Sequence, residues 1–189
     1  MKLDPARPYP PAPYAGEFLP SFPLTSADFD DGQSLPAGQT ATGGNISPRL
    51  AWSGFPEATK SFLVTATDPD ARRGASWHWV LSDVPVTVTA LPAGGRRTVL
   101  QVLADAIFAR QRPMAGVSGS LQRRNSIGAT GFMGAMPPKG DHAHRYVFAV
   151  HALDVERLDV PWKAGPREVL AAAGPHTLAR AVLTGTNQR

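Results

Sequence analysis

The chain has 189 residues, of which 18 are glycine, 19 are proline and none is cysteine. Glycine and proline interrupt helices and central strands, so helical bundles and coiled coils are disfavoured. The absence of cysteine excludes disulfide frameworks, thiolate catalysis and cysteine-based metal sites. With 42% apolar residues, 18% charged residues and a net charge of +4, the sequence is that of a globular protein with a mildly basic surface.

Prolines recur throughout residues 1–23, and a segment of this kind favours an extended or irregular backbone. The aromatic residues between the prolines are Tyr9, Tyr14, Phe18 and Phe22. We expect the segment to pack across the surface through these rings. It precedes a single domain over residues 24–189, because no internal repeat or linker divides the rest of the chain.

The start of the chain meets prolines almost at once and lacks the apolar stretch of a signal peptide. No apolar run approaches the length of a membrane-spanning helix. We therefore expect a cytoplasmic protein with no transmembrane segment. The basic residues are scattered rather than gathered in a stripe or on an aromatic platform, which argues against nucleic acid as a partner.

Three segments have the apolar, β-branched and aromatic composition of strands: residues 61–67, 77–84 and 145–153. The third is apolar on both of its alternating faces, which predicts a central strand covered on each side. Helices are expected over residues 99–111 and in a short segment that begins at Pro166 and ends at Gly174. Residues 175–183 predict one more short helix. The fold class is mostly β with a small C-terminal helical part.

Two neighbouring segments gather polar groups. Asp68 and Asp70 flank Pro69 directly after the first strand, and His78 lies near the start of the second. A hairpin-like return would bring His78 near one of the two carboxylates. A locally satisfied turn and a hydrogen-bonded core histidine explain the same residues without function.

A third polar segment covers residues 134–146. Gly134, Pro137 and Pro138 predict a rigid loop, while His144 and Tyr146 share one face of the following strand. Two interpretations stay open. The pair His142 and His144, completed by Asp68 or His78, resembles a zinc ligand set. His144 and Tyr146 as donors beside the N–H groups of the loop equally describe an anion pocket.

The ordered set of motifs resembles the phosphatidylethanolamine-binding protein family, most closely its prokaryotic, Raf-kinase-inhibitor-like branch. The motifs are Asn45-Ile46-Ser47-Pro48-Arg49-Leu50-Ala51-Trp52, Asp68-Pro69-Asp70-Ala71, His78-Trp79-Val80, Pro137-Pro138 with Gly140-Asp141, His144-Arg145-Tyr146 and Ala152-Leu153-Asp154. The likeness runs from about residue 21 to about residue 185. The proline-rich start and residues 98–120 lie outside its strong part.

The resemblance implies a large antiparallel sheet, a smaller sheet and short C-terminal helices. It also implies a small pocket that accepts phosphate, acetate or a phospholipid head group. Carried over to this chain, the ligand-binding residues are Asp68, Asp70, His78, Gly134, Pro137, Pro138, His144 and Tyr146. Imidazoles and loop N–H groups would face the anion, and the carboxylates would orient the imidazoles.

The chain departs from the family pattern at several positions. Phe132 stands where a tyrosine is usual. Gly134-Ala135-Met136 stands where the family loop usually has a Gly-Pro pair. Arg72 and Arg73 follow the Asp-Pro-Asp-Ala run, where they would raise the affinity for anions if they point inward. Asn187 stands near a position that is often tyrosine.

We expect a binding protein for a small phosphate or carboxylate ligand or a phosphorylated head group. No catalytic residue is assigned, because no nucleophile-base arrangement is evident. No metal or cofactor is assigned either. The alternative is a metal-assisted or acid/base hydrolase that uses the same histidines and carboxylates. A regulatory role through a protein partner, and a homodimer as is common in the resembling branch, also stay open.

Overall fold

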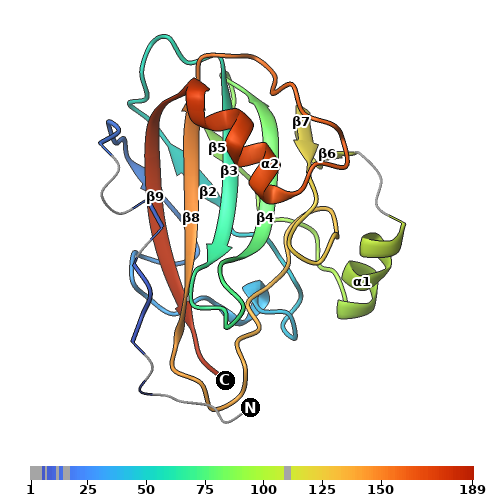
Figure 1. Ribbon diagram of the computed structural model, residues 1–189. Helices are drawn as coiled ribbons and strands as arrows, with labels where there is room; N and C mark the ends of the chain where they lie inside the picture. Colours follow the sequence, from blue (N-terminus) through green and yellow to red (C-terminus); the bar gives the residue numbers. More distant parts are fainter. Residues whose placement is uncertain (1–5, 7, 12, 15–17, 109–111) are drawn as a thin grey trace.

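The computed structural model describes residues 6, 8–11, 13–14, 18–108 and 112–189. A six-stranded sheet has the strand order β6-β7-β4-β3-β8-β9, and all its neighbours are antiparallel. A three-stranded sheet, also antiparallel, has the order β1-β2-β5. Figure 1 shows β9, β8, β3 and β4 side by side, with α2 lying across one face of this sheet.

The strands of the large sheet are β3 (Ser61–Asp68), β4 (Ser76–Pro85), β6 (Arg112–Met114), β7 (Val117–Gln122), β8 (His144–Leu153) and β9 (Thr177–Asn187). Those of the small sheet are β1 (Leu24–Thr25), β2 (Leu50–Trp52) and β5 (Ala90–Leu91). The helices are α1 (Val99–Ile107) and α2 (Pro166–Ala173), and single 3-10 turns cover Ala37–Gln39 and Gly174–His176. The mostly-β fold with two sheets is confirmed.

The large sheet buries both of its faces. Phe62 and Phe148 point to one face, where Phe62 meets Trp52 of the small sheet with 5.2 Å between ring centroids. Leu63 and Val80 point to the other face, where α2 covers them through Val169. This alternation follows from the period of two along a strand. It explains why β8, between β3 and β9, reads as apolar on both sides.

The helix predicted over residues 175–183 is wrong. The chain leaves α2 through the 3-10 turn and enters β9, which pairs with β8 along its length. Ala179, Ala181 and Leu183 are buried, while Val182 between them is exposed. Small residues on alternate positions fit a strand that packs closely on a sheet. The local sequence favours a helix, but this segment forms a strand because it hydrogen-bonds to the edge of β8 that β3 leaves unpaired.

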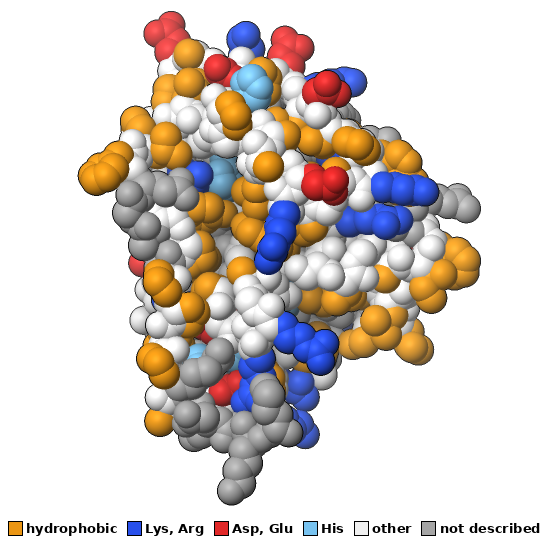
Figure 2. Space-filling model, viewed as in Figure 1, with side chains coloured by type: hydrophobic (Ala, Val, Ile, Leu, Met, Phe, Trp, Pro, Cys, Tyr) orange, Lys and Arg blue, Asp and Glu red, His pale blue; other side chains and the backbone are white. Residues whose placement is uncertain are grey.

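The helix predicted over residues 99–111 is present as α1, while residues 109–111 lie outside the described part of the chain. Its start is capped by Thr98, whose side chain accepts the N–H of Gln101. Val102 is buried, but Leu100 and Ile107 on the opposite side are 78% and 76% exposed. Figure 2 shows apolar side chains gathered on the surface at this place, at the lower right.

Among the described residues, none of the helices has the length and apolar content that crossing a bilayer would require.

Candidate anion-binding pocket

A pocket of about 480 Å³ opens at the end of the large sheet where β3 turns into β4 and β8 begins. Its walls come from the β3–β4 turn, from Ser126, from the loop of residues 133–138 and from the first residue of β8. Five of the residues predicted from the sequence line it: Asp68, His78, Pro137, Pro138 and His144. Segments more than 60 positions apart thus meet in one concave surface.

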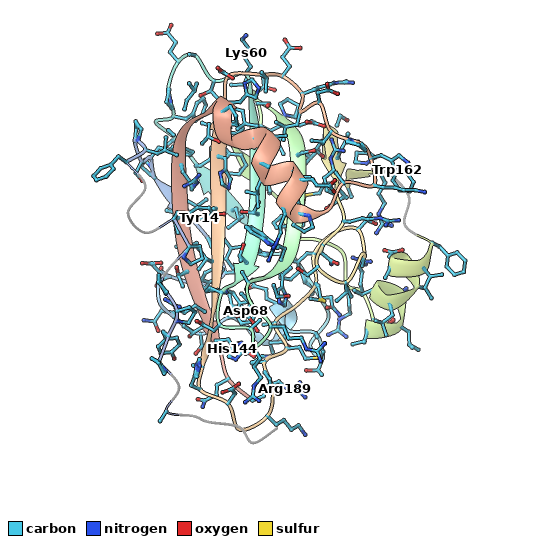
Figure 3. All side chains as sticks on the ribbon, viewed as in Figure 1. Tyr14, Lys60, Asp68, His144, Trp162 and Arg189 are labelled. Atoms are coloured by element: carbon cyan, nitrogen blue, oxygen red, sulfur yellow. The ribbon has the colours of Figure 1, made fainter. Side chains whose placement is uncertain are left out.

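Asp68 and His144 form the centre of this arrangement. Nδ1 of His144 lies 2.8 Å from Oδ2 of Asp68, and both side chains are buried. Figure 3 shows the two residues together at the lower end of the sheet. The other oxygen of Asp68 accepts the N–H of Asp70 at 2.9 Å, which closes the turn after β3. The carboxylate therefore fixes both the turn and the orientation of the imidazole.

The two pocket histidines have opposite pKa shifts. Burial lowers the pKa of His78, although its hydrogen bond to the carbonyl of Met133 opposes this shift. Burial also acts to lower the pKa of His144, but the hydrogen bond and charge of Asp68, with the nearby carboxylate of Asp141, raise it above the ordinary value. His144 is thus the ring that carries positive charge more readily, and His78 is a neutral hydrogen-bonding group.

Arg72 and Arg73 both line the pocket, as expected if the two arginines point inward. The Nε–H of Arg72 donates to Oδ2 of Asp141 at 3.1 Å, and the Asp141 side chain has no exposed surface. Burial alone would raise the pKa of Asp141, but the hydrogen bonds from Arg72 and from the N–H of His142, together with the nearby ring of His144, lower it overall. Asp141 is not among the site residues predicted from the sequence, although it follows Gly140 in the motif that carries the resemblance.

Three of the predicted site residues, Asp70, Gly134 and Tyr146, do not line the pocket. The buried carboxylate of Asp70 is bound by the guanidinium of Arg145 through both oxygens. The ring of Tyr146 stands edge-on to His78 with 5.2 Å between centroids. Burial, with the nearby charge of Asp68, raises the pKa of Tyr146. Its buried hydroxyl has no hydrogen-bond partner within the described part of the chain.

Gly134 acts through the backbone. Its N–H donates to Oδ1 of Asn45 at 2.8 Å, and a Cβ there would lie 2.4 Å from the carbonyl carbon of Thr40. Asn45 in turn donates from Nδ2 to the carbonyls of Ala41 and Arg97. The Asn45 side chain therefore ties the pocket loop to two other loops. Asn45 belongs to one of the motifs that carry the resemblance, but its partners Gly134 and Arg97 lie 89 and 52 positions further along the chain.

The three loop residues that depart from the family pattern differ in whether they line the pocket. Phe132 packs in the core against Trp79 and Phe148, away from the pocket wall. Ala135 is buried and exchanges backbone hydrogen bonds with Gln39 and Ala41. Met136 is half exposed and lines the pocket, so of these three loop positions it is the one that faces the pocket.

Comparison with known proteins places this chain in a family. The family model described as "Phosphatidylethanolamine-binding protein" matches residues 25–188. The UPF0098 protein YbhB of Escherichia coli (strain K12) is 42% identical over 167 residues, covering 85% of this chain and 96% of the relative. The UPF0098 protein YbcL of the same organism is also 42% identical, over 147 residues, covering 74% of this chain and 73% of the relative.

Solved structures agree with this comparison. The crystal structure of Escherichia coli YbcL superposes with a TM-score of 0.75 at 37% identity, covering 89% of this chain and 99% of that one. The homologue from Chlamydia trachomatis has a TM-score of 0.71 at 28% identity, covering 89% and 98%. Since both the sequence match and the fold extend over nearly the whole chain, the protein belongs to the phosphatidylethanolamine-binding protein family.

Proposed function

We propose that the chain is a binding protein for a small phosphate- or carboxylate-bearing ligand, which it holds in the pocket around Asp68 and His144. The observation that carries this proposal concerns His144, which lines the pocket: its buried Nε2 has no hydrogen-bond partner in the described part of the chain, and Oδ2 of Asp141 lies 3.5 Å from it. With its other nitrogen bound to Asp68, the protonated ring offers an N–H to an anionic oxygen.

The charge of the pocket favours an anion. Its lining includes the guanidinium groups of Arg72 and Arg73 and the ring of His144, against the carboxylate of Asp68. Arg72 is partly neutralised by Asp141, while Arg73 lies exposed at the rim. Arginine suits phosphate and carboxylate because its planar donors match two oxygens at once.

The apolar part of the lining favours an organic substituent on that anion. Met136, Pro137 and Pro138 present apolar surface to the pocket, and Met136 is half exposed. A phosphomonoester such as phosphoethanolamine would place its phosphate at the basic wall and its carbon chain at the apolar wall. Binding sites of this size combine apolar surface with a few placed polar groups in this way.

Calorimetry on the full chain in the presence of EDTA tests this proposal with phosphate, acetate and phosphoethanolamine. We expect phosphate to bind and phosphoethanolamine to bind more tightly. His144→Gln should weaken phosphate binding about tenfold or more, because it removes a charge-assisted hydrogen bond. Arg73→Gln should weaken it less, because that side chain is exposed.

His176→Gln is the matched control, since His176 also pairs with a carboxylate, Asp154 at 2.8 Å, but does not line the pocket. Its affinity for phosphate should equal that of the unchanged protein. The proposal fails if none of the three ligands binds, or if His144→Gln and Arg73→Gln both bind phosphate as the control does.

A further inference from the structure

Three metal-binding side chains meet beside the pocket: Asp141, His142 and His144. All three are buried, and each offers one ligand atom so that these atoms lie within 4.8 Å of one another. This grouping contains neither Asp68 nor His78, which the sequence suggested as partners of the two histidines. We propose that Asp141, His142 and His144 bind a divalent transition-metal ion, for which zinc is the best fit.

The spacing between two of the ligands suits a metal better than a hydrogen bond. Nε2 of His144 lies 3.5 Å from Oδ2 of Asp141, and this nitrogen has no hydrogen-bond partner in the described part of the chain. His144 is 1% exposed, so water does not solvate the ring freely. A tetrahedral zinc ion with bonds of about 2.0–2.1 Å holds adjacent ligand atoms roughly 3.3 Å apart.

Each histidine has the hydrogen bond that metal ligation requires on its other nitrogen. Nδ1 of His144 lies 2.8 Å from the Asp68 carboxylate, and Nδ1 of His142 lies 2.9 Å from the carbonyl of Ala143. When Nδ1 donates to these oxygens, Nε2 carries the lone pair. Carboxylate or carbonyl partners on the second nitrogen are the usual surroundings of zinc-binding histidines. Asp68 therefore acts as an orienting group in this site.

The carboxylate of Asp141 has room for a metal beside its existing partners. Oδ2 accepts from Arg72 at 3.1 Å, and Oδ1 accepts the N–H of His142 at 3.1 Å. A carboxylate has about four lone-pair positions, so two remain. Arg72 holds the carboxylate in place but also competes with a cation for its charge. We expect Arg72 to moderate the affinity of the site rather than to abolish it.

The neighbouring residues hold the site rigid. The ring of Tyr9 packs edge-on to His142 with 4.5 Å between centroids, and its hydroxyl donates to the carbonyl of Ala143 at 2.8 Å. The side chain of Gln188 donates to the carbonyl of Asp141 at 3.0 Å. Ligands that are fixed before the ion arrives lose little conformational entropy on binding.

The donor types select the metal. Two imidazoles and one carboxylate suit zinc, and also cobalt, nickel or copper, whereas calcium and magnesium prefer oxygen ligands alone. Three protein ligands leave a fourth position for water or for another small ligand, unlike the closed sites that are purely structural. A metal at this place would replace the proton of His144 and keep a positive charge beside the pocket.

Metal titration of the full chain, without an affinity tag, tests the proposal. After treatment with EDTA and its removal, Zn²⁺ binding is measured by calorimetry and Co²⁺ binding by visible absorption. We expect one ion per chain and the intense absorption of four-coordinate cobalt. His142→Ala should lower the affinity for both ions by at least about tenfold and abolish the four-coordinate cobalt spectrum.

The same variant separates this proposal from the anion-binding function. His142 does not line the pocket, so His142→Ala should bind phosphate in EDTA as the unchanged protein does, which also shows that it folds. His176→Ala is the matched control and should keep the metal. The proposal is overturned if the unchanged protein binds no stoichiometric zinc or cobalt. It is equally overturned if His142→Ala and Asp141→Asn both bind these ions as His176→Ala does.

Discussion

The guanidinium of Arg145 binds both oxygens of Asp70, with Nη2 at 2.7 Å from Oδ1 and Nε at 3.0 Å from Oδ2. The backbone N–H of Arg145 donates to the same carboxylate at 2.8 Å. Asp70 is fully buried, and the arginine side chain is 22% exposed. Arg145 also donates to the carbonyl of Pro10 and lies over the ring of Tyr9. This pair joins the β3–β4 turn, the start of β8 and the N-terminal segment.

Arg145→Leu should therefore destabilise the protein strongly. It leaves the buried Asp70 carboxylate without its counter-charge, and breaking such a pair costs about 3–5 kcal/mol. Urea denaturation gives the free energy of unfolding. The matched control is Arg49→Leu, because Arg49 pairs with Asp28 at an exposed position and should contribute little. Equal losses in the two variants would contradict the role assigned to Asp70.

The buried position of His151 predicts that the folded protein loses stability in acid. His151 lies on β8, accepts from Nε of Arg180 at 3.0 Å, and has its other nitrogen 3.4 Å from Oγ1 of Thr65. Burial and the charge of Arg180 lower its pKa to about 3. The unfolded chain binds a proton at this ring below about pH 6.5, and the folded protein does not until about pH 3. The free energy of unfolding must therefore decrease as the pH is lowered from about 6.5 toward about 3.

The expected loss from this one group is about 2 kcal/mol between pH 7 and pH 5. His151→Gln keeps an acceptor for Arg180 but cannot gain a proton, so its stability should fall less over the same range. Urea denaturation at pH 7, 6 and 5 measures both slopes. Parallel slopes for the two proteins would show that His151 is not held neutral.

Gly134→Ala tests the close approach of the pocket loop to residues 40–41. The added methyl would lie 2.4 Å from the Thr40 carbonyl carbon and 2.6 Å from the Ala41 nitrogen, both of them backbone atoms that cannot rotate away. We expect a loss of about 1–3 kcal/mol and weaker phosphate binding, since the shift displaces the loop that contains Pro137. Calorimetry and thermal denaturation measure these effects.

Gly174→Ala is the control for this change. A Cβ at Gly174 meets no atom within 4 Å, and the residue has right-handed helical geometry. This variant should be neutral or slightly more stable than the unchanged protein. Should Gly134→Ala behave in the same way, the contact with Thr40 does not constrain the loop.

The orientation of α1 gives a further prediction. Val102 is 3% exposed, while Leu100 and Ile107 point to the surface. Val102→Ala should lower the free energy of unfolding by about 1–3 kcal/mol, because it leaves space in a packed interior. Leu100→Gln and Ile107→Gln should have little effect, since they remove no buried apolar surface. The opposite order of effects would mean that the helix packs on its other side.

Much of the fold followed from local patterns. Residues 61–67, 77–84 and 145–153 are strands within one residue of their predicted ends, because alternating apolar side chains are a local property of the chain. The helix from Pro166 to Ala173 followed from an equally local signal, a proline at its first turn. The strand at Thr177–Asn187 did not, because its short apolar run also suits a helix.

The pocket, like the fold, was predicted only in part from the sequence. The motifs of the resemblance named five residues that line it, since their order along the chain is a property of the sequence. Local pattern gave no hint that Asp70 pairs with Arg145, 75 positions away, rather than facing a ligand. It also pointed to Asp68 or His78 as the metal partner of His142 and His144, whereas the side chain whose ligand atom groups with those of the two histidines within 4.8 Å is that of Asp141.

The glycines and prolines that disfavour a helical bundle also shape the loops around the pocket, and the sequence alone indicated this second role only in part. Composition and periodicity determined that the protein is a β fold with rigid loops. Only the tertiary structure decided which polar groups in those loops satisfy one another and which remain directed at the pocket. The reason is physical: periodicity reports on neighbours along the chain, whereas buried charges must find partners in space, wherever the sheet brings them together.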